Sequence, residues 1–246
     1  MLQFYILIIG FLLTIILTKA TILIAQKRQL FEANDHRKLH TETVSALGGI
    51  PIFLGFWVMV VLFNFPVTAY LGILLGTGLL LYVGVEDDFN NTRVSKRFAA
   101  QIFAASIAYF SGFHFGWDGT WWLTLLNYGS TIFFIVLLIN SYNLIDGING
   151  LAGGLGFISM LLFGSLFMSI GLTHLSWIAF AYAIATGSFL LFNFGKKATI
   201  FMGDNGSTVL GFLIGVFTLK MLQIGTITTD FKPILLVVTA LSLIHI

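Results

Sequence analysis

Five carboxylates follow apolar runs at separate points of the chain, and their spacing suits the binding of a metal ion and phosphate. Glu86, Asp87 and Asp88 follow LLLYVGV, Asp146 lies in NSYNLIDGING, and Asp204 lies in FMGDNGS. Mg²⁺ commonly binds one or two carboxylates together with substrate phosphates. Lysines and arginines near these segments can bind anions, and the neighbouring asparagines can form hydrogen bonds. Phosphoryl transfer uses this combination of groups.

Long apolar runs separate these polar segments, so membrane helices must position them. The 246 residues are 58% hydrophobic and only 9% charged, far from the average of soluble proteins. Apolar runs of roughly 17 to 22 residues recur, and each can cross a hydrocarbon core of about 30 Å as a helix. We predict an all-α, polytopic integral membrane bundle that forms one domain over residues 1–246. The net charge of +2 does not indicate a nucleic-acid partner.

The apolar runs predict eight helices, with a ninth beginning at residue 233, and hence eight or nine membrane spans. Their expected ranges are 2–25, 47–64, 68–86, 98–116, 120–140, 151–171, 174–191 and 207–227. The chain ends inside an apolar run at LSLIHI, and one back-translation of these residues is the end of a transposon adapter used in sequencing libraries. We therefore expect Leu241–Ile246 to be non-biological and the chain to be truncated at its C-terminus.

The basic residues predict the orientation of the bundle. They gather in alternate connections, which the positive-inside rule places in the cytoplasm, with the N-terminus in the periplasm. These residues are Lys27, Arg28, Arg37, Lys38, Arg93, Lys96, Arg97, Lys196 and Lys197. The five carboxylates fall on the same face, whereas Asp118 and Asp230 fall on the other. The sequence thus predicts a polar site of mixed charge that faces the cytoplasm.

Four motifs in this order resemble those of the polyprenyl-phosphate N-acetylhexosamine-1-phosphate transferases, an integral membrane family. The motifs are HRKLHTETVSALGG, VEDDFNNTRVSKRFAAQ, NSYNLIDGINGLAGG and FNFGKKATIFMGDNGS. The resemblance implies transfer of sugar-1-phosphate from a UDP-N-acetylhexosamine to undecaprenyl phosphate at the cytoplasmic face of the bacterial inner membrane, with release of UMP. It implies Mg²⁺ as the cofactor, with Mn²⁺ as an alternative. The product would initiate a cell-envelope glycan, and a homodimer is left open.

The resemblance also implies roles for individual residues. Asp87, Asp88 and Asp204 are the expected catalytic residues, and Asp88 and Asp204 the expected metal ligands. The expected substrate-binding residues are Lys38, His40, Lys96, Arg97, Asn143, Asp146, Asn149 and Asn193. The family often has an aspartate where this chain has Asn149, so a hydrogen-bonding role is expected there. The aspartate-pair loop is slightly longer than usual, which leaves open whether Arg93, Lys96 or Arg97 corresponds to the family's basic residue.

Each motif also has a purely structural interpretation. Asp87 and Asp88 could mark a helix end, and adjacent helical side chains point about 100° apart. Asp204 or Ser207 could be the N-cap of the next helix. The loop HRKLH could serve only to orient the chain in the membrane. Polar residues recur every three positions from Asn140 to Asn149, and one helix cannot direct all four toward one site.

Two other functions remain as alternatives. A transferase that makes lipid I would carry the pattern Lys-x-Gly-Thr-Pro-Thr before its paired glycines. This chain has the paired glycines but lacks that pattern, so the UDP-N-acetylglucosamine branch is favoured. A transporter would be expected to show an inverted repeat and broken helices with charges in mid-span, whereas here the charges gather at one face. For the transferase we favour direct attack by the lipid phosphate over a covalent intermediate on an aspartate, because a phosphate monoester is mostly dianionic at pH 7.

Overall fold

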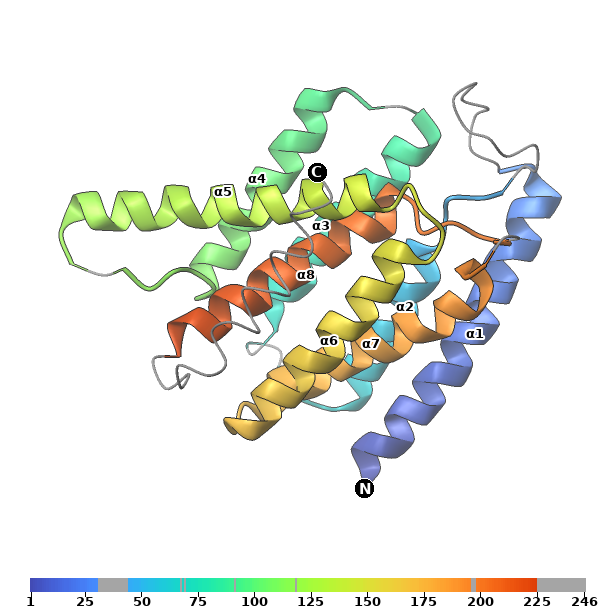
Figure 1. Cartoon of the computed structure of the whole chain (residues 1–246), viewed down its shortest axis with the longest axis horizontal. Coiled ribbons are helices and arrows are strands. Elements are labelled where there is room, and N and C mark those ends of the chain that lie inside the picture. The colour runs from blue at the N-terminus through green and yellow to red at the C-terminus, as the bar shows by residue number, and fades with distance from the viewer. Residues whose placement is uncertain are drawn as a thin grey trace.

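A computed structural model describes residues 1–30, 44–66, 68, 70–90, 92–117, 119–195 and 198–224, and within these ranges the chain is helical (Figure 1). The helices are α1 (Leu2–Arg28), α2 (Gly49–Leu62), α3 (Leu71–Asn90), α4 (Val94–Phe110), α5 (Trp121–Ile145), α6 (Leu151–Ser169), α7 (Thr173–Asn193) and α8 (Asp204–Gln223). Each corresponds to one of the first eight predicted helices. The predicted ninth helix and the tail Leu241–Ile246 lie outside the described residues.

The polar motifs are more helical than the apolar runs alone predict. Helix α3 continues to Asn90, α4 begins at Val94 rather than near 98, and α5 continues to Ile145 rather than ending near 140. Helix α8 begins at Asp204 instead of 207. A helix satisfies its own backbone hydrogen bonds, so it can extend beyond the apolar run that crosses a membrane. Arg97 and Asn143 are therefore presented from helices and not from loops.

Five of the described helices are long and apolar enough to cross a membrane: α1, α5, α6, α7 and α8. Helix α2 is also apolar but has only 14 residues. Many large apolar side chains on the outer faces remain exposed, as on α1 and on the first half of α5. These observations identify an integral membrane helical protein.

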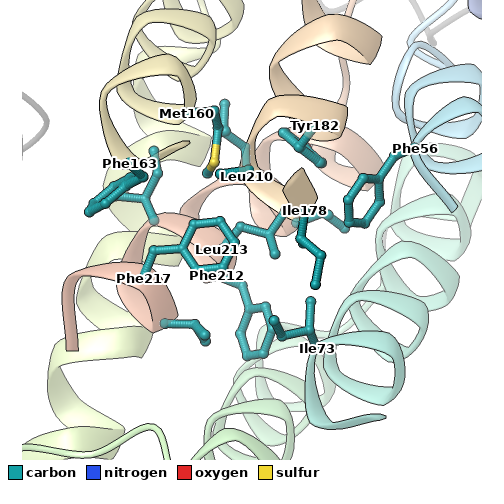
Figure 2. Close-up of a cluster of buried hydrophobic side chains, with 14 of the residues drawn as sticks. Phe56, Ile73, Met160, Phe163, Ile178, Tyr182, Leu210, Phe212, Leu213 and Phe217 are labelled. Atoms are coloured by element: carbon teal, nitrogen blue, oxygen red, sulfur yellow. The ribbon is translucent and has the colours of Figure 1, made fainter. Parts of the chain in front are cut away.

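Helix α8 is the centre of the bundle. Every residue from Asn205 to Leu219 is buried, because α2, α3, α5 and α6 all pack against this helix. Figure 1 shows α1 at one edge, beside α2 and α7, while α4 and α5 lie on the opposite side. Figure 2 shows the core around α8, where Phe212, Leu213 and Phe217 meet side chains from α2, α3, α6 and α7.

Two glycines allow neighbouring helices to approach α8 closely. A Cβ atom at Gly84 of α3 would lie 2.5 Å from Cα of Asn205, and one at Gly211 of α8 would lie 2.6 Å from the carbonyl oxygen of Leu138 on α5. Small residues permit such close helix packing in membranes. Gly84 and Gly211 allow α3 and α5 to pack closely against α8. The polar residues of the predicted motifs lie near the beginning of α8.

Candidate functional site

The predicted aspartates and Arg97 meet where α3 and α5 end and α4 and α8 begin. We call this group the carboxylate site and define it by Asp87, Arg97, Asn143 and Asp204. Each residue comes from a different helix: α3, α4, α5 and α8, respectively. The side chains of Arg97 and Asp204 are 30% and 29% exposed, whereas that of Asp87 is 9% exposed. The charges are therefore partly shielded from solvent but remain reachable.

The guanidinium of Arg97 joins the other three residues. Its Nη1 lies 2.8 Å from Oδ2 of Asp87, and its Nη2 lies 3.1 Å from Oδ2 of Asp204. Nη2 also donates a longer hydrogen bond to Oδ1 of Asn143, at 3.4 Å. Asn143 in turn donates from Nδ2 to Oδ1 of Asp204 at 2.6 Å and to Oγ of Ser207 at 3.2 Å. One cation thus faces oxygens from three helices.

The adjacent aspartates Asp87 and Asp88 have different partners. Oδ1 of Asp87 accepts hydrogen bonds from the amide and hydroxyl of Thr92, at 2.8 and 2.7 Å, which fixes the turn between α3 and α4. Asp88 accepts hydrogen bonds from the amides of Asp204 and Asn205, at 3.1 and 3.3 Å, and from the side chain of Asn205. This divergence follows from the helical angle between adjacent side chains.

Asp88 therefore caps α8 from a neighbouring helix. The first amides of an α-helix have no partner within that helix, and a carboxylate near them is favoured by hydrogen bonding and by the helix dipole. The N-cap residue itself is Gly203, and its position carries no side-chain cap. The interpretation of Asp204 or Ser207 as the N-cap was thus wrong, because α8 begins one residue after Gly203 and its first two amides donate to Asp88 of α3.

The turn before α8 is held from two further directions. The amide of Gly203 donates to Oδ2 of Asp146 at 3.1 Å, and Gly203 has a φ of 75°, which favours glycine. Nδ2 of Asn205 donates to the carbonyl of Ala46 at 2.6 Å. Ser45 and Phe201 are joined by a backbone hydrogen bond of 2.8 Å. Asp146 and the segment after the first basic loop therefore fix the position from which Asp204 projects.

The four polar residues of NSYNLIDGING face four different partners, and because α5 ends at Ile145, Asp146 and Asn149 are placed by the turn after the helix. Asn140 pairs with Gln101 of α4, Asn143 with Asp204, and Asp146 with Gly203. Asn149 donates to the carbonyl of Gly195, at 3.4 Å. Of this series, Asn143 directly contacts Arg97 and Asp204 of the carboxylate site.

Asn193 supports the chain around the site. It is 4% exposed, accepts a hydrogen bond of 2.8 Å from the amide of Gly150 and donates one of 2.9 Å to the carbonyl of Ile200. It thus joins the end of α7 to the beginning of α6 and to the segment that leads into α8. These contacts make Asn193 a support for the turns in this structure.

The basic residues predicted to bind substrate fall into three groups. Arg97 lies within the carboxylate site, where it pairs with both Asp87 and Asp204. Lys96 forms an ion pair with Glu86, and its side chain is 50% exposed. Lys38 and His40 lie outside the described residues.

A small cleft opens beside the carboxylate site. Its polar wall contains Asp87, Arg97, Gln101, Asp204 and Thr208, and its apolar wall contains Leu80, Val83 and Gly84 of α3. Gln101, Thr92 and Asn205 were not among the predicted site residues. Gln101 could have been found from its position four residues after Arg97, which places both side chains on one face of a helix.

The oxygen donors of the carboxylate site suit a hard divalent cation. Oδ2 of Asp87, Oδ2 of Asp204 and Oδ1 of Asn143 all face the guanidinium of Arg97, and Mg²⁺ prefers such oxygens. The described residues contain no group of three acidic, histidine or cysteine side chains arranged to hold a metal. A cation here would need phosphate or water oxygens as well, which is common for Mg²⁺. Asp88 fits less well because α8 occupies both of its oxygens.

The fold and site define a class: an integral membrane helical bundle that carries a carboxylate and arginine site where four helix ends meet. Residues 70–222 match the model of glycosyl transferase family 4. This chain therefore belongs to glycosyl transferase family 4, which confirms the resemblance inferred from its motifs.

The chain is similar to several curated proteins. It is 32% identical over 201 residues to the undecaprenyl-phosphate alpha-N-acetylglucosaminyl 1-phosphate transferase of Salmonella typhi, covering 78% of this chain and 55% of that protein. It is 29% identical over 219 residues to the probable undecaprenyl-phosphate N-acetylglucosaminyl 1-phosphate transferase of Bacillus subtilis, covering 86% and 61%. The chain thus spans little more than half the length of these relatives.

Proposed function

We propose that this protein transfers N-acetylhexosamine-1-phosphate from a UDP-sugar to undecaprenyl phosphate and thereby initiates synthesis of a cell-envelope glycan. The observation that carries the proposal is the carboxylate site, in which Arg97 faces oxygens of Asp87, Asn143 and Asp204. The cleft beside these charges is also lined by Leu80, Val83 and Gly84 of α3. The names of the relatives supply the reaction and favour N-acetylglucosamine as the sugar.

We further propose the bacterial inner membrane as the location, with the carboxylate site facing the cytoplasm and the N-terminus facing the periplasm. The support is the clustering of basic residues in alternate connections. In this arrangement α2, α3 and α4 also cross the membrane, which gives eight spans among the described helices. Residues 1–246 would belong to one transferase domain. A cytoplasmic site would have access to a soluble nucleotide sugar.

We propose that Asp204 and Asp87 hold Mg²⁺, with Asn143 as an oxygen donor and Mn²⁺ as an alternative metal. When bound, the cation neutralises charge on the diphosphate and on the transferring phosphoryl group. We assign the second carboxylate to Asp87 and not to the originally predicted Asp88, because Asp88 accepts hydrogen bonds from the beginning of α8. In this assignment Asp88 acts through Asp204, whose backbone it holds.

Arg97 and the divalent cation would compete for the same oxygens. The guanidinium must leave Oδ2 of Asp87 and Oδ2 of Asp204 before those atoms can bind a metal. A released guanidinium can form paired hydrogen bonds to a phosphate. We propose that the guanidinium of Arg97 would then bind substrate phosphate in place of the two carboxylates.

The remaining predicted residues are assigned to the surroundings of the substrate. Lys96 would attract the anionic substrates from its exposed position, and Lys38 and His40 would contact the diphosphate from the first basic loop. Asp146, Asn149 and Asn193 would shape the nucleotide-sugar site through the backbone turns that they bind. In these assignments Lys96, Lys38 and His40 interact with the anionic substrates, whereas Asp146, Asn149 and Asn193 hold the backbone turns in place.

In the proposed reaction, an oxygen of the lipid phosphate attacks the phosphorus that carries the sugar. The bond between this phosphorus and the bridging oxygen breaks, and UMP leaves with that oxygen. A phosphate monoester has a second pKa near 6 and is mostly dianionic at pH 7, so no protein group has to remove a proton. A covalent sugar-phosphate adduct on Asp87 or Asp88, trapped in the absence of lipid phosphate, would contradict this mechanism.

The test is transfer of radiolabelled sugar-phosphate from a panel of UDP-sugars to undecaprenyl phosphate. The panel includes UDP-N-acetylmuramoyl-pentapeptide, which would reveal the lipid I reaction. Membranes should contain the open reading frame re-amplified from its source DNA, since the chain covers 55% of its Salmonella relative. We expect lipid product that requires Mg²⁺, is lost in Asp204→Asn and persists in Asp118→Asn. An inserted protein that uses no UDP-sugar would refute the proposed function.

A further inference from the structure

A reciprocal amide pair lies next to the carboxylate site and has no role in the proposed chemistry. Nδ2 of Asn140 on α5 donates to Oε1 of Gln101 on α4 at 2.7 Å, and Nε2 of Gln101 donates the return hydrogen bond at 3.4 Å. Asn140 also donates to the carbonyl of Val136 in its own helix, at 2.8 Å. Gln101 is only 3% exposed and Asn140 is partly exposed, so this polar contact is part-buried between the two helices.

The amide pair is one of two polar contacts at this end of α4 and α5. Gln101 lies one turn after Arg97 on α4, and Asn140 lies nearly one turn before Asn143 on α5. Arg97 donates to Asn143, which gives the first contact, and Gln101 with Asn140 gives the second. Gln101 also lines the cleft together with Asp87 and Asp204. The second contact therefore lies about one helical turn from Arg97 and Asn143.

A part-buried amide pair restricts how two helices can slide or rotate. Displacing α4 along α5 would separate both amides in a region with little water, where unpaired polar groups are costly. Apolar neighbours such as Ala104 and Ala105 can accept small shifts without a comparable penalty. In other helical assemblies a single buried amide fixes the register between helices.

We propose that Gln101 and Asn140 form a positioning pair that fixes α4 against α5. In this position the guanidinium of Arg97 reaches Asp87, Asn143 and Asp204. The pair acts through Arg97 and Asn143 and does not supply a reacting group. The inference rests on the proposed function for its catalytic consequence, whereas its geometric consequence can be measured independently of activity.

The absence of cysteine in the sequence makes a direct distance measurement possible. Spin labels on Val94→Cys and Leu144→Cys would report the separation of α4 and α5 near the site, since these side chains are 66% and 64% exposed. We expect a narrow distance distribution in this labelled parent and a broadened or shifted one when Gln101→Leu is added. The double exchange Gln101→Asn with Asn140→Gln should restore the narrow distribution, because it retains both amides and their combined length.

The matched control is Ser106→Ala, which removes a different polar contact between the same helices, the 2.9 Å contact to Tyr128. This control should leave the label distances near the site unchanged. In transfer assays Gln101→Leu should lower kcat by about ten- to a hundredfold, as expected for misplaced site groups, with KM for the UDP-sugar within about twofold. The double exchange should recover most of the lost kcat.

Two results would overturn the positioning role. One is Gln101→Leu with an unchanged distance distribution and wild-type kcat, and the other is a double exchange that restores neither quantity. Failure of the proposed function would look different. In that case the unlabelled wild-type chain would transfer no sugar-phosphate, while the label distances would still decide whether Gln101 and Asn140 fix the two helices.

Discussion

The two ends of the helix pair α4 and α5 both carry polar clusters, but the clusters differ in charge and in origin. At the far end, Nδ2 of Asn127 contacts Nδ1 of His114 at 3.3 Å and donates to the carbonyl of Trp117 at 3.4 Å. At the carboxylate site, Arg97 pairs with Asp87 and Asp204. The far cluster joins residues close in sequence, whereas the carboxylate site joins helices α3 to α5 with α8.

This difference shows why a buried polar group does not by itself indicate a functional site. Asn127 is 1% exposed and makes hydrogen bonds with nearby groups of the α4–α5 connection, so its contacts maintain a turn. Arg97 binds carboxylates that could also bind a metal ion, and its guanidinium could also bind phosphate. Contacts that a ligand can replace distinguish the carboxylate site from the far cluster.

The largest expected effect is a loss of transfer activity at the carboxylate site, compared with a matched change at the far cluster. Asp204→Ala should reduce sugar-phosphate transfer by about a thousandfold, because it removes a proposed metal ligand and one partner each of Arg97 and Asn143. Asn127→Ala should leave the transfer rate within about twofold of wild type. Initial rates at saturating substrates test both expectations. Similar losses of activity in both variants would erase the proposed distinction between the ends.

The next effect distinguishes capping from metal binding at Asp88. Asp88→Ala should lower the free energy of unfolding by about 2 kcal/mol, because α8 loses hydrogen bonds at its beginning. Asp88→Asn should retain part of this stability, since its one carbonyl oxygen can still accept a hydrogen bond from the beginning of α8, whereas its amide nitrogen cannot. Unfolding in detergent measures this difference. Loss of Mn²⁺ binding by a stable Asp88→Asn protein would instead establish Asp88 as a ligand.

A smaller effect is expected for metal affinity at Arg97. Arg97→Gln should strengthen Mn²⁺ binding by about tenfold, because the ion would no longer have to displace a guanidinium from two carboxylates. Electron paramagnetic resonance titration measures free Mn²⁺ without requiring turnover. Arg97→Lys should also bind Mn²⁺ more tightly, since one ammonium group cannot span both carboxylates as the guanidinium does.

Arg93→Gln is the matched control for this titration because it removes the same charge one turn earlier in the sequence. An increase in affinity as large as that in Arg97→Gln would mean that general electrostatic repulsion, and not competition for oxygens, limits metal binding. Unchanged Mn²⁺ affinity in both Arg97 variants would contradict the proposed competition between the guanidinium and the cation for the carboxylate oxygens.

The smallest expected effect is a loss of stability at the far cluster. Asn127→Ala should lower the free energy of unfolding by about 1 kcal/mol, the usual net contribution of a hydrogen bond. Thermal unfolding in detergent would measure the change, and Mn²⁺ affinity should not change. A change in Mn²⁺ affinity would show that the two ends of α4 and α5 are coupled.

The sequence by itself determined the helical membrane architecture and the residues that gather at one end. Bilayer thickness sets the length of an apolar span, so eight helices could be located from local composition, although polar residues extended several of them. The motifs also identified the family and selected Asp87, Asn143 and Asp204. Lys38, His40 and the ninth helix remain predictions from the sequence.

The partner of each polar side chain, by contrast, follows from how the helices pack. Asp87 faces Arg97, while its neighbour Asp88 caps a helix that begins 116 residues later. Gln101 gained its position from Asn140, which is 39 residues away. Such pairings depend on how each helix is rotated about its axis and on where glycines such as Gly84 allow close approach. Local composition sets where a helix crosses the membrane, but contacts between helices set what its polar groups meet.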